Sequence, residues 1–272
     1  MQGCSVHTQR KEFEIEGLTS MRMLQFKNKY FNYKKIIIAD VFSGTGFNTV
    51  NQTQIDGSPI KLIKGFNDAT SRGKPFDKEV HFWFSDIRED SCTALNGNVN
   101  QAIKELPNNN LCGKVKIEKM TASDAINKLG NALYRNQDCY MFLLLDPNGP
   151  KDFPIKELRD LINMYSKRID VIPYISATAI NRCIGARTNA KTQFNSWLGD
   201  IENFDQGFVQ SLISNKRQGW IRTPNQCDNQ NWTMIPTFGK SPPHSDWNKQ
   251  GYVEIGTEDS NNAIEYYCGK RN

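Results

Sequence analysis

Apolar residues along the chain alternate between short continuous runs and segments in which they recur with the period of a helix. The continuous runs are rich in β-branched, aromatic and leucine residues and have the length of strands. We expect strands at 34–40, 79–86, 113–120, 138–146 and 169–178, with helices between them at 58–72, 91–106, 121–135 and 153–168. Ser58 is expected to cap the first of these helices, with Pro59 at its first position, and Thr121 or Ser123 the third. Such an alternation is typical of a parallel sheet whose two faces are covered by helices.

The two ends of the chain carry weaker patterns. Residues 1–30 are expected to form an N-terminal helical extension, and residues 31–272 an α/β domain with a helical insertion at about 185–230. Two further strands are expected at 231–239 and 251–257, and the last strand is expected to run antiparallel. The sequence therefore predicts a Rossmann-like, doubly wound, mostly parallel sheet. A Rossmann-type oxidoreductase would share the first half of this pattern, so the fold by itself does not identify the chemistry.

Composition narrows the function classes. The chain has 272 residues, a formal net charge of +5 and a pI near 8.7, which permits DNA or RNA as a partner without requiring one. The seven cysteines are scattered without a CxxC pair and the three histidines lie far apart, so we expect neither a metal site nor a disulfide framework. The N-terminal segment is polar and no apolar run reaches the roughly 18 residues of a membrane helix, so we expect a cytoplasmic protein with no membrane contact.

Acidic residues follow four consecutive strands. Asp40, Asp86 and Asp146 end three of the expected strands, and Ser123-Asp124 follows the strand at 113–120. Because ligands of open α/β sheets bind where the carboxyl ends of parallel strands meet, we expect these side chains to lie at one site. Each residue also has a structural explanation, since Asp is common where strands turn into helices and Asp124 suits the first turn of a helix.

The loop after the first strand has the composition of a ligand-binding turn. Gly44 and Gly46 let the backbone adopt positive φ and approach a ligand closely. Asp86 is placed to accept hydrogen bonds from two ribose hydroxyls, with Asp56 as the rival acceptor. No GK[ST] sequence follows, the GxGxxG spacing is broken, and Asp40 leads into the loop, so a phosphate is disfavoured and a ligand with a cationic end is favoured. S-adenosylmethionine, which carries an ammonium and a sulfonium but no phosphate, fits this description.

The segment "DVFSGTG" at 40–46 resembles the first motif of class I methyltransferases that act on nucleic acids, D-[LV]-F-[AS]-G-x-G. Together with "IDGSPIKL" and "LLLDPNG", it looks like the three-Cys-motif partner proteins, a family of predicted S-adenosylmethionine-dependent methyltransferases, over roughly residues 20–180. The resemblance implies a sheet of the class I methyltransferase type with S-adenosylmethionine as its cofactor. The implied cofactor-binding residues are, from the methionine end through the ribose to the adenine, Asp40, Phe42, Gly44, Gly46, Asp86, Ile87, Ser123 and Asp124.

The same resemblance implies a methyl-accepting site at Asp146, Pro147 and Asn148. Enzymes that methylate exocyclic base amines carry [DNS]PP[YFW] at this place, and Asn148-Gly149 departs from the second half of that motif, which argues against a base amine as the acceptor. The chain also has no Pro-Cys pair, which disfavours the cytosine C5 mechanism. We expect Asp146 to orient a nitrogen or oxygen nucleophile that displaces the methyl group directly.

The expected reaction is methyl transfer to a nucleic acid, with a protein or a small molecule as the second substrate class. A binding module that keeps the cofactor pocket without catalysis, and a nicotinamide-dependent oxidoreductase, are the alternatives. Tyr174 and Phe153 are candidates for stacking on a base, and the basic tract at 215–222 around Trp220 is a candidate for contact with a phosphate backbone. The structural explanations are that the two aromatic residues pack in the core and that the tract at 215–222 is a solvated surface turn.

Overall fold

The computed structural model describes residues 6–27, 32–50, 52–73, 75–107, 111, 113–147, 154–165, 168–176, 218–221 and 254–255. The chain forms two compact units, Met1–Leu143 and Leu144–Asn272. In chain order the elements of the first unit are α1 (Val6–Phe26), β1 (Lys35–Asp40), β2 (Phe47–Val50), β3 (Thr53–Asp56), α2 (Ser58–Ser71), β4 (Glu79–Asp86), α3 (Glu89–Lys104), β5 (Lys114–Lys119), α4 (Ala122–Arg135) and β6 (Cys139–Leu145), whose last two residues belong to the second unit. The elements of the second unit are α5 (Ile155–Tyr165), β7 (Ile169–Ser176), β8 (Gln218–Ile221) and β9 (Glu254–Ile255).

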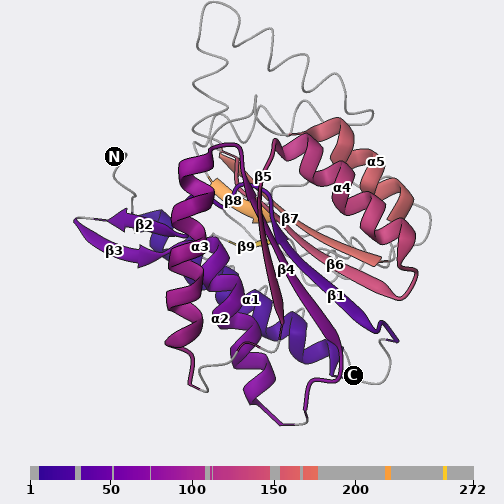
Figure 1. Cartoon of the computed structure of the whole chain (residues 1–272), viewed down its shortest axis with the longest axis horizontal. Helices are drawn as coiled ribbons and strands as arrows, with labels where there is room; N and C mark the ends of the chain where they lie inside the picture. Colours follow the sequence, from indigo (N-terminus) through magenta and orange to yellow (C-terminus); the bar gives the residue numbers. More distant parts are fainter. Residues whose placement is uncertain are drawn as a thin grey trace, which may run out of the picture. The chain divides into compact units, whose positions relative to one another are not determined.

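The sheet of the first unit runs in the order β5, β4, β1, β6 (Figure 1). β1 pairs in parallel with β4, and β4 pairs in parallel with β5. All seven residues of β6 are buried, as are five of the six residues of β1, which is the burial expected of strands covered on both faces. The bounds of these four strands agree with the predicted ones to within one residue at each end.

Helices cover both faces of this sheet. On one face the ring of Phe66 in α2 meets the ring of Phe82 in β4 edge-on, with 5.4 Å between the centroids. On the other face the ammonium of Lys128 in α4 lies 5.3 Å from the ring centroid of Trp83. Because Phe82 and Trp83 are successive residues of one strand, their side chains point to opposite faces of the sheet. α2 and α4 therefore cover opposite faces, and α3 lies beside α2.

α1 packs along α2, with both helices running in the same direction. The carboxylate of Glu16 pairs with the ammonium of Lys61 at 2.7 Å, and further along both helices the Ser20 hydroxyl donates to Asp68. The backbones approach closely, because a Cβ added at Gly65 would lie 2.3 Å from the carbonyl oxygen of Glu16. The two helices consequently begin at the same end of the first unit.

A buried arginine anchors α1 to β6. Arg22 is 1% exposed, and its Nη2 donates to the Tyr140 hydroxyl at 2.6 Å. The guanidinium also lies over the rings of Phe26 and Tyr140, at 5.1 and 5.2 Å from their centroids, and Nη1 donates to Gln25. A buried guanidinium requires such partners, so the contact fixes the C-terminal half of α1 within the core.

Residues 47–57 were expected to be an insertion without a helix or strand, and the structure differs from this expectation. They form a β-hairpin in which β2 and β3 pair antiparallel. The hairpin escaped prediction because its strands are four residues long and polar, and because its turn includes Gln52 at φ 67°, a conformation usually taken by glycine or asparagine.

The N-terminus of α2 also differs from its prediction. The expectation that Ser58 caps this helix is wrong, because Gly57 is the N-cap and Ser58 is the first helical residue. The Ser58 hydroxyl instead donates to the carboxylate of Asp40 at 2.7 Å. Thr121, by contrast, does cap α4, since its hydroxyl accepts the backbone N–H of Asp124.

In the second unit, β8 pairs antiparallel with β7, and β9 pairs antiparallel with β8. β8 lies within the stretch expected to be a helical insertion, so that prediction is wrong for Gln218–Ile221, where Trp220 and Ile221 are residues that favour strands. The rest of the helical insertion expected at about 185–230, and the strand expected at 231–239, lie outside the described residues. The chain is thus a mixed α/β protein whose mostly parallel sheet is compatible with a Rossmann-like fold. Among its described helices, none combines the length and apolar character that crossing a bilayer requires.

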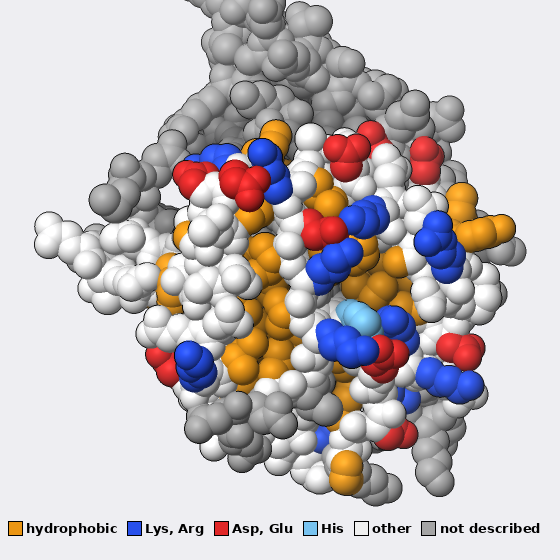
Figure 2. Space-filling model, viewed as in Figure 1, with side chains coloured by type: hydrophobic (Ala, Val, Ile, Leu, Met, Phe, Trp, Pro, Cys, Tyr) orange, Lys and Arg blue, Asp and Glu red, His pale blue; other side chains and the backbone are white. Residues whose placement is uncertain are grey.

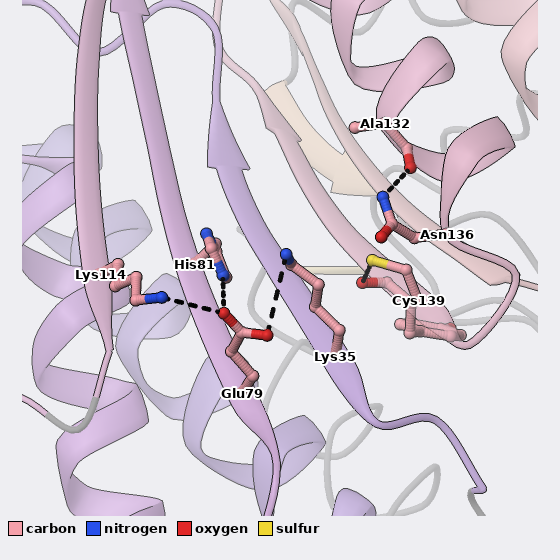
Figure 3. A network of polar contacts seen from close by, with 8 residues as sticks. Lys35, Glu79, His81, Lys114, Ala132, Asn136 and Cys139 are labelled. Carbon is pink, nitrogen blue, oxygen red and sulfur yellow. Dashed lines mark hydrogen bonds and ion pairs between the residues drawn. The ribbon is translucent and has the colours of Figure 1, made fainter.

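In the view of Figure 2, lysine, arginine and acidic side chains lie interspersed on the visible face of the molecule. A polar network centred on Glu79 of β4 forms part of this group (Figure 3). Its carboxylate accepts hydrogen bonds from His81 at 2.6 Å and from Lys114 at 3.2 Å, and Lys35 lies 3.9 Å away. The two hydrogen bonds and the charge of Lys35 lower the pKa of Glu79 from 4.5 to about 2.

The substitution Gly65→Ala should destabilise the protein. Its Cβ would meet the Glu16 carbonyl, so α1 and α2 must move apart, and we expect the free energy of unfolding to fall by about 1–3 kcal/mol. The matched control is Gly97→Ala, inside α3, where an added Cβ meets nothing within 4 Å. There we expect a gain of about 0.5–1 kcal/mol from helix propensity. Urea unfolding of both variants measures the difference, and equal effects would contradict the close packing of the two helices.

Replacing Glu79 by glutamine should reduce the acid sensitivity of the fold. A carboxylate whose pKa is lowered on folding contributes stability above its unfolded pKa of 4.5, and this contribution is lost as the pH falls from 4.5 to about 2. We expect the melting temperature of the wild type to fall more steeply than that of Glu79→Gln in this range. Since the Glu79 side chain is 48% exposed, high salt should narrow the difference. Thermal unfolding at two ionic strengths tests this expectation. Melting temperatures of the two proteins that fall equally with pH would show that the network does not stabilise the fold.

Candidate functional site

The glycine loop, residues 41–46, lies over the carboxyl ends of β1 and β4. The N–H of Ser43 donates to the carbonyl oxygen of Ser85 in β4 at 3.0 Å, which joins the loop to the neighbouring strand. Gly44 and Gly46 have φ of 56° and 81°, in the left-handed region that glycine adopts without a steric penalty. The predicted need for glycine at these two positions is therefore confirmed.

Asp86 and Gly44, two residues predicted for the site from separate strand ends, are joined by a hydrogen bond. The N–H of Gly44 donates to Oδ2 of Asp86 at 3.1 Å, and the N–H of Arg88 donates to Oδ1 at 2.9 Å. The Arg88 guanidinium lies 3.5 Å from the same oxygen. The Asp86 side chain remains 14% exposed, and each carboxylate oxygen can accept more than one hydrogen bond. This carboxylate therefore both fixes the loop and can receive donors from a ligand.

Asp40, at the end of β1, fixes the loop through hydrogen bonds of its buried carboxylate. Its side chain is fully buried, and the carboxylate accepts the N–H of Phe42 at 2.9 Å through one oxygen and the Ser58 hydroxyl at 2.7 Å through the other. Its carbonyl oxygen accepts the hydroxyl of Ser43 at 2.7 Å. The structure thus shows Asp40 joining the loop to the start of α2, and its contact with the methionine end of a cofactor stays a prediction. Phe42 is half-buried and takes part in this bonding through its backbone.

Asp56, the rival ribose acceptor, is committed to other partners. Its carboxylate lies 2.6 Å from the ammonium of Lys64 and 3.5 Å from that of Lys61. These pairs join β3 to α2. Asp86, by contrast, is bonded to the glycine loop itself through the amide of Gly44, and its role as the ribose acceptor stays a prediction.

Neighbouring elements surround the loop on several sides. The N–H of Gly57 donates to the carbonyl oxygen of Gly46 at 2.8 Å, and the side-chain amide of Asn98 in α3 donates to the carbonyl oxygen of Thr45 at 2.8 Å. A Cβ at Gly46 would lie 2.8 Å from Leu95, whereas a Cβ at Gly44 would meet nothing within 4 Å. Gly44 therefore presents the side of the loop that no described residue covers. Sequence reasoning missed Asn98 because an asparagine on a polar helix face carries no signal of such a bond.

Ile87, Ser123 and Asp124 lie at the neighbouring strand ends. Ile87 follows the carboxylate of Asp86 directly and is 63% exposed. The N–H of Met120 donates to the carbonyl oxygen of Asp86 at 3.0 Å, so the turn that leads into α4 begins beside this residue. Asp124 is exposed and accepts the Thr121 hydroxyl at 2.7 Å, which supports its structural explanation as a first-turn acid. Ser123 is half-buried, and the adenine contact of both residues stays a prediction.

The predicted methyl-accepting residues belong to the second unit. Asp146 and Pro147 directly follow β6 and are half-buried, while Asn148 and Phe153 lie outside the described residues. Tyr174 in β7 and Trp220 in β8 are backbone partners across the antiparallel ladder, so these two aromatic candidates share one register position. The tract around Trp220 contains a strand at this place, which excludes a simple surface turn for Gln218–Ile221.

The described residues contain no group of three or more His, Cys, Asp or Glu side chains that could hold a metal ion. Cys92 lies beneath the site, with its Sγ 3.6 Å from the carbonyl oxygen of Asp86. Burial, together with the charges of Asp86 and Glu89, raises the pKa of this thiol. A raised pKa favours the neutral thiol, which is a weaker nucleophile than the thiolate.

Comparison with known proteins adds little to this geometry. No protein-family model matches the chain, and no curated protein is significantly similar to it. A similar solved structure is the crystal structure of protein LPL1258 from Legionella pneumophila str. Philadelphia 1, which is described with the family model DUF519. The similarity has a TM-score of 0.40 and 12% sequence identity, and it covers 70% of this chain and 74% of that chain. A likeness of this strength assigns neither a family nor a function.

Proposed function

We propose that this protein is an S-adenosylmethionine-dependent methyltransferase with a sheet of the class I type, acting on a nitrogen or oxygen nucleophile of a nucleic acid. The observation that carries the proposal is the hydrogen bond between the Gly44 amide and the Asp86 carboxylate, beside the uncovered side of Gly44. Ligands of open α/β sheets bind at such strand ends.

The three parts of the cofactor have matching surfaces in the first unit. Asp86 offers a partly exposed carboxylate for the two ribose hydroxyls, and the exposed side chain of Ile87 next to it offers an apolar surface for the adenine. The uncovered backbone at Gly44 lets the methionine end approach closely. These surfaces follow one another along two adjacent strand ends.

The charges around the loop disfavour a phosphate ligand. A phosphate site usually presents free helix N-terminal amides without nearby acids. Here α3 begins with Glu89 and Asp90 in its first turn, and Asp86 itself takes the Gly44 amide that a phosphate would need. The positive charge of Arg88 is balanced by Asp86 at 3.5 Å. An acidic environment of this kind suits a ligand with a cationic end and supports S-adenosylmethionine over a nicotinamide dinucleotide.

Methyl transfer would need alignment and exclusion of water more than chemical activation by the protein. S-adenosylmethionine supplies a methyl group already activated by its sulfonium. Asp146 would orient the accepting atom and stabilise the positive charge that develops on a nitrogen, with the Pro147 carbonyl and Asn148 holding the acceptor. The net charge of +5 is compatible with a nucleic acid as the carrier of that atom.

Gly44→Ala should weaken cofactor binding more than it weakens the fold. The added methyl group would occupy the side of the loop where the ligand approaches, and we expect S-adenosylmethionine affinity to fall at least about tenfold. Gly73→Ala is the matched control, because Gly73 has φ of 67° and equally open surroundings outside the site. Both variants should lose about 1 kcal/mol of stability from the backbone conformation alone. Isothermal titration of the two variants and the wild type measures the affinity, and equal affinities in both variants would place the cofactor elsewhere.

Labelled S-adenosylmethionine should transfer its methyl group to nucleic acid. We expect label in the DNA or RNA fraction after incubation with the wild type, and we expect Asp146→Ala to bind the cofactor with unchanged affinity but to lose transfer. Separation of DNA, RNA and protein fractions, with calorimetry on the same preparations, provides both readouts. Binding without transfer to any fraction would indicate a binding module, label in protein would indicate the second substrate class, and a melting temperature raised by NADH alone would indicate an oxidoreductase.

A further inference from the structure

α1 contributes a buried carboxylate near the glycine loop. Glu12 is 2% exposed, and its Oε1 accepts a hydrogen bond from the side-chain amide of Asn48 at 3.1 Å. Asn48 lies in β2, two residues after Gly46. A carboxylate is costly to bury unless it is hydrogen-bonded, so the bond to Asn48 contributes to keeping Glu12 in the fold.

Asn48 connects this carboxylate to the loop. Its Nδ2 lies 3.4 Å from the position that a Cβ on Gly57 would take. Gly57 in turn donates its N–H to the carbonyl oxygen of Gly46 at 2.8 Å, and a Cβ on Gly57 would lie 3.0 Å from the backbone of Gly46. The side chain of Asn48 therefore packs where the end of the loop meets the start of α2. Asn48 thus adjoins Gly57, the residue that donates to the Gly46 backbone.

The backbone of α1 is fixed by contacts further along the helix. Gly65 of α2 packs against the carbonyl group of Glu16, one helical turn after Glu12, and Arg22 anchors the helix to Tyr140. Because α1 and α2 run in the same direction, the N-terminal part of α1 lies at the end of α2 where the loop is. The helix expected from the sequence to be an extension is thus in contact with the candidate site.

We propose that Glu12 is a positioning residue for the cofactor loop. Its carboxylate holds Asn48, Asn48 supports the contact between Gly57 and Gly46, and the loop is thereby kept in the conformation that presents Gly44. This inference rests on the proposed function for the identity of the ligand, S-adenosylmethionine. The hydrogen bond from Asn48 requires an acceptor oxygen at this position.

Two substitutions at Glu12 separate the effect of the acceptor oxygen from the effect of the negative charge. Glu12→Gln keeps an oxygen that can accept from Asn48, whereas Glu12→Ala removes it. Asn48→Ala removes the other partner and provides a second variant if Glu12→Ala does not fold. Glu16→Ala is the matched control, since it removes from the same helix a carboxylate that pairs with Lys61 of α2 and makes no hydrogen bond to Asn48.

Hydrogen exchange of the ligand-free protein gives the first readout. Three loop amides report directly on the conformation, because the N–H groups of Ser43, Gly44 and Gly46 donate to Ser85, Asp86 and Ser43, respectively. We expect Glu12→Ala and Asn48→Ala to accelerate exchange in peptides covering residues 43–48, and we expect Glu12→Gln and Glu16→Ala to leave it at the wild-type rate. A purely structural effect of lost stability would instead accelerate exchange throughout α1 and α2.

Titration with S-adenosylmethionine gives the second readout. We expect the affinity to fall about tenfold in Glu12→Ala and Asn48→Ala, and to change less than about twofold in Glu12→Gln and Glu16→Ala. Two results would overturn the positioning role. One is an affinity of Glu12→Gln as low as that of Glu12→Ala, and the other is a rate of loop exchange in Glu12→Ala equal to that in Glu16→Ala. A wild-type protein that does not bind S-adenosylmethionine would overturn the proposed function alone, since the exchange measurement needs no ligand.

Discussion

Two carboxylates at the ends of adjacent parallel strands determine the conformation of the glycine loop. Asp40 accepts two hydrogen bonds at zero exposure, and Asp86 accepts the amide of Gly44 while remaining partly exposed. Desolvating a carboxylate costs several kcal/mol, and donors aimed at its oxygens offset that cost. Because the loop amide and the Ser58 hydroxyl are these donors, the loop cannot rearrange without leaving a buried charge poorly solvated. The same contacts that stabilise the strand ends therefore preorganise the candidate site.

The loop is supported by segments that are distant in the sequence. Asn98 comes from α3, Gly57 from the start of α2 and, through Asn48, Glu12 from α1. Asn98 and Gly57 donate to main-chain carbonyl groups of the loop, whereas Glu12 accepts from the side chain of Asn48. A ligand that binds at Gly44 would therefore meet a backbone with little freedom left to lose, and preorganisation of this kind improves affinity by reducing the ordering cost of binding.

Sequence patterns predicted the strands much better than they predicted the site. β1, β4, β5 and β6 were predicted within one residue because their patterns are local properties of the sequence. β1 and β6 are almost continuously apolar, as doubly covered strands are, whereas apolar and charged residues alternate in β5. The role of Ser58 and the bond of Asn98 to Thr45 were missed because they depend on partners 18 and 53 residues away. The acids at the strand ends were found from their positions, but their different burial was not predictable. Exposure depends on which helix start lies over a strand end, and hydrophobic periodicity carries no information about that.

The two compact units divide the proposed activity. The residues proposed to hold the cofactor, from Asp40 to Asp124, belong to the first unit, and the residues proposed to hold the methyl acceptor, Asp146 to Asn148, belong to the second. Cofactor binding is consequently expected to be a property of Met1–Leu143. A methyltransferase and a binding module would share this binding and would differ in whether the methyl group is transferred. Loss of transfer with unchanged binding would therefore locate the difference after β6, and loss of binding would locate it at the glycine loop.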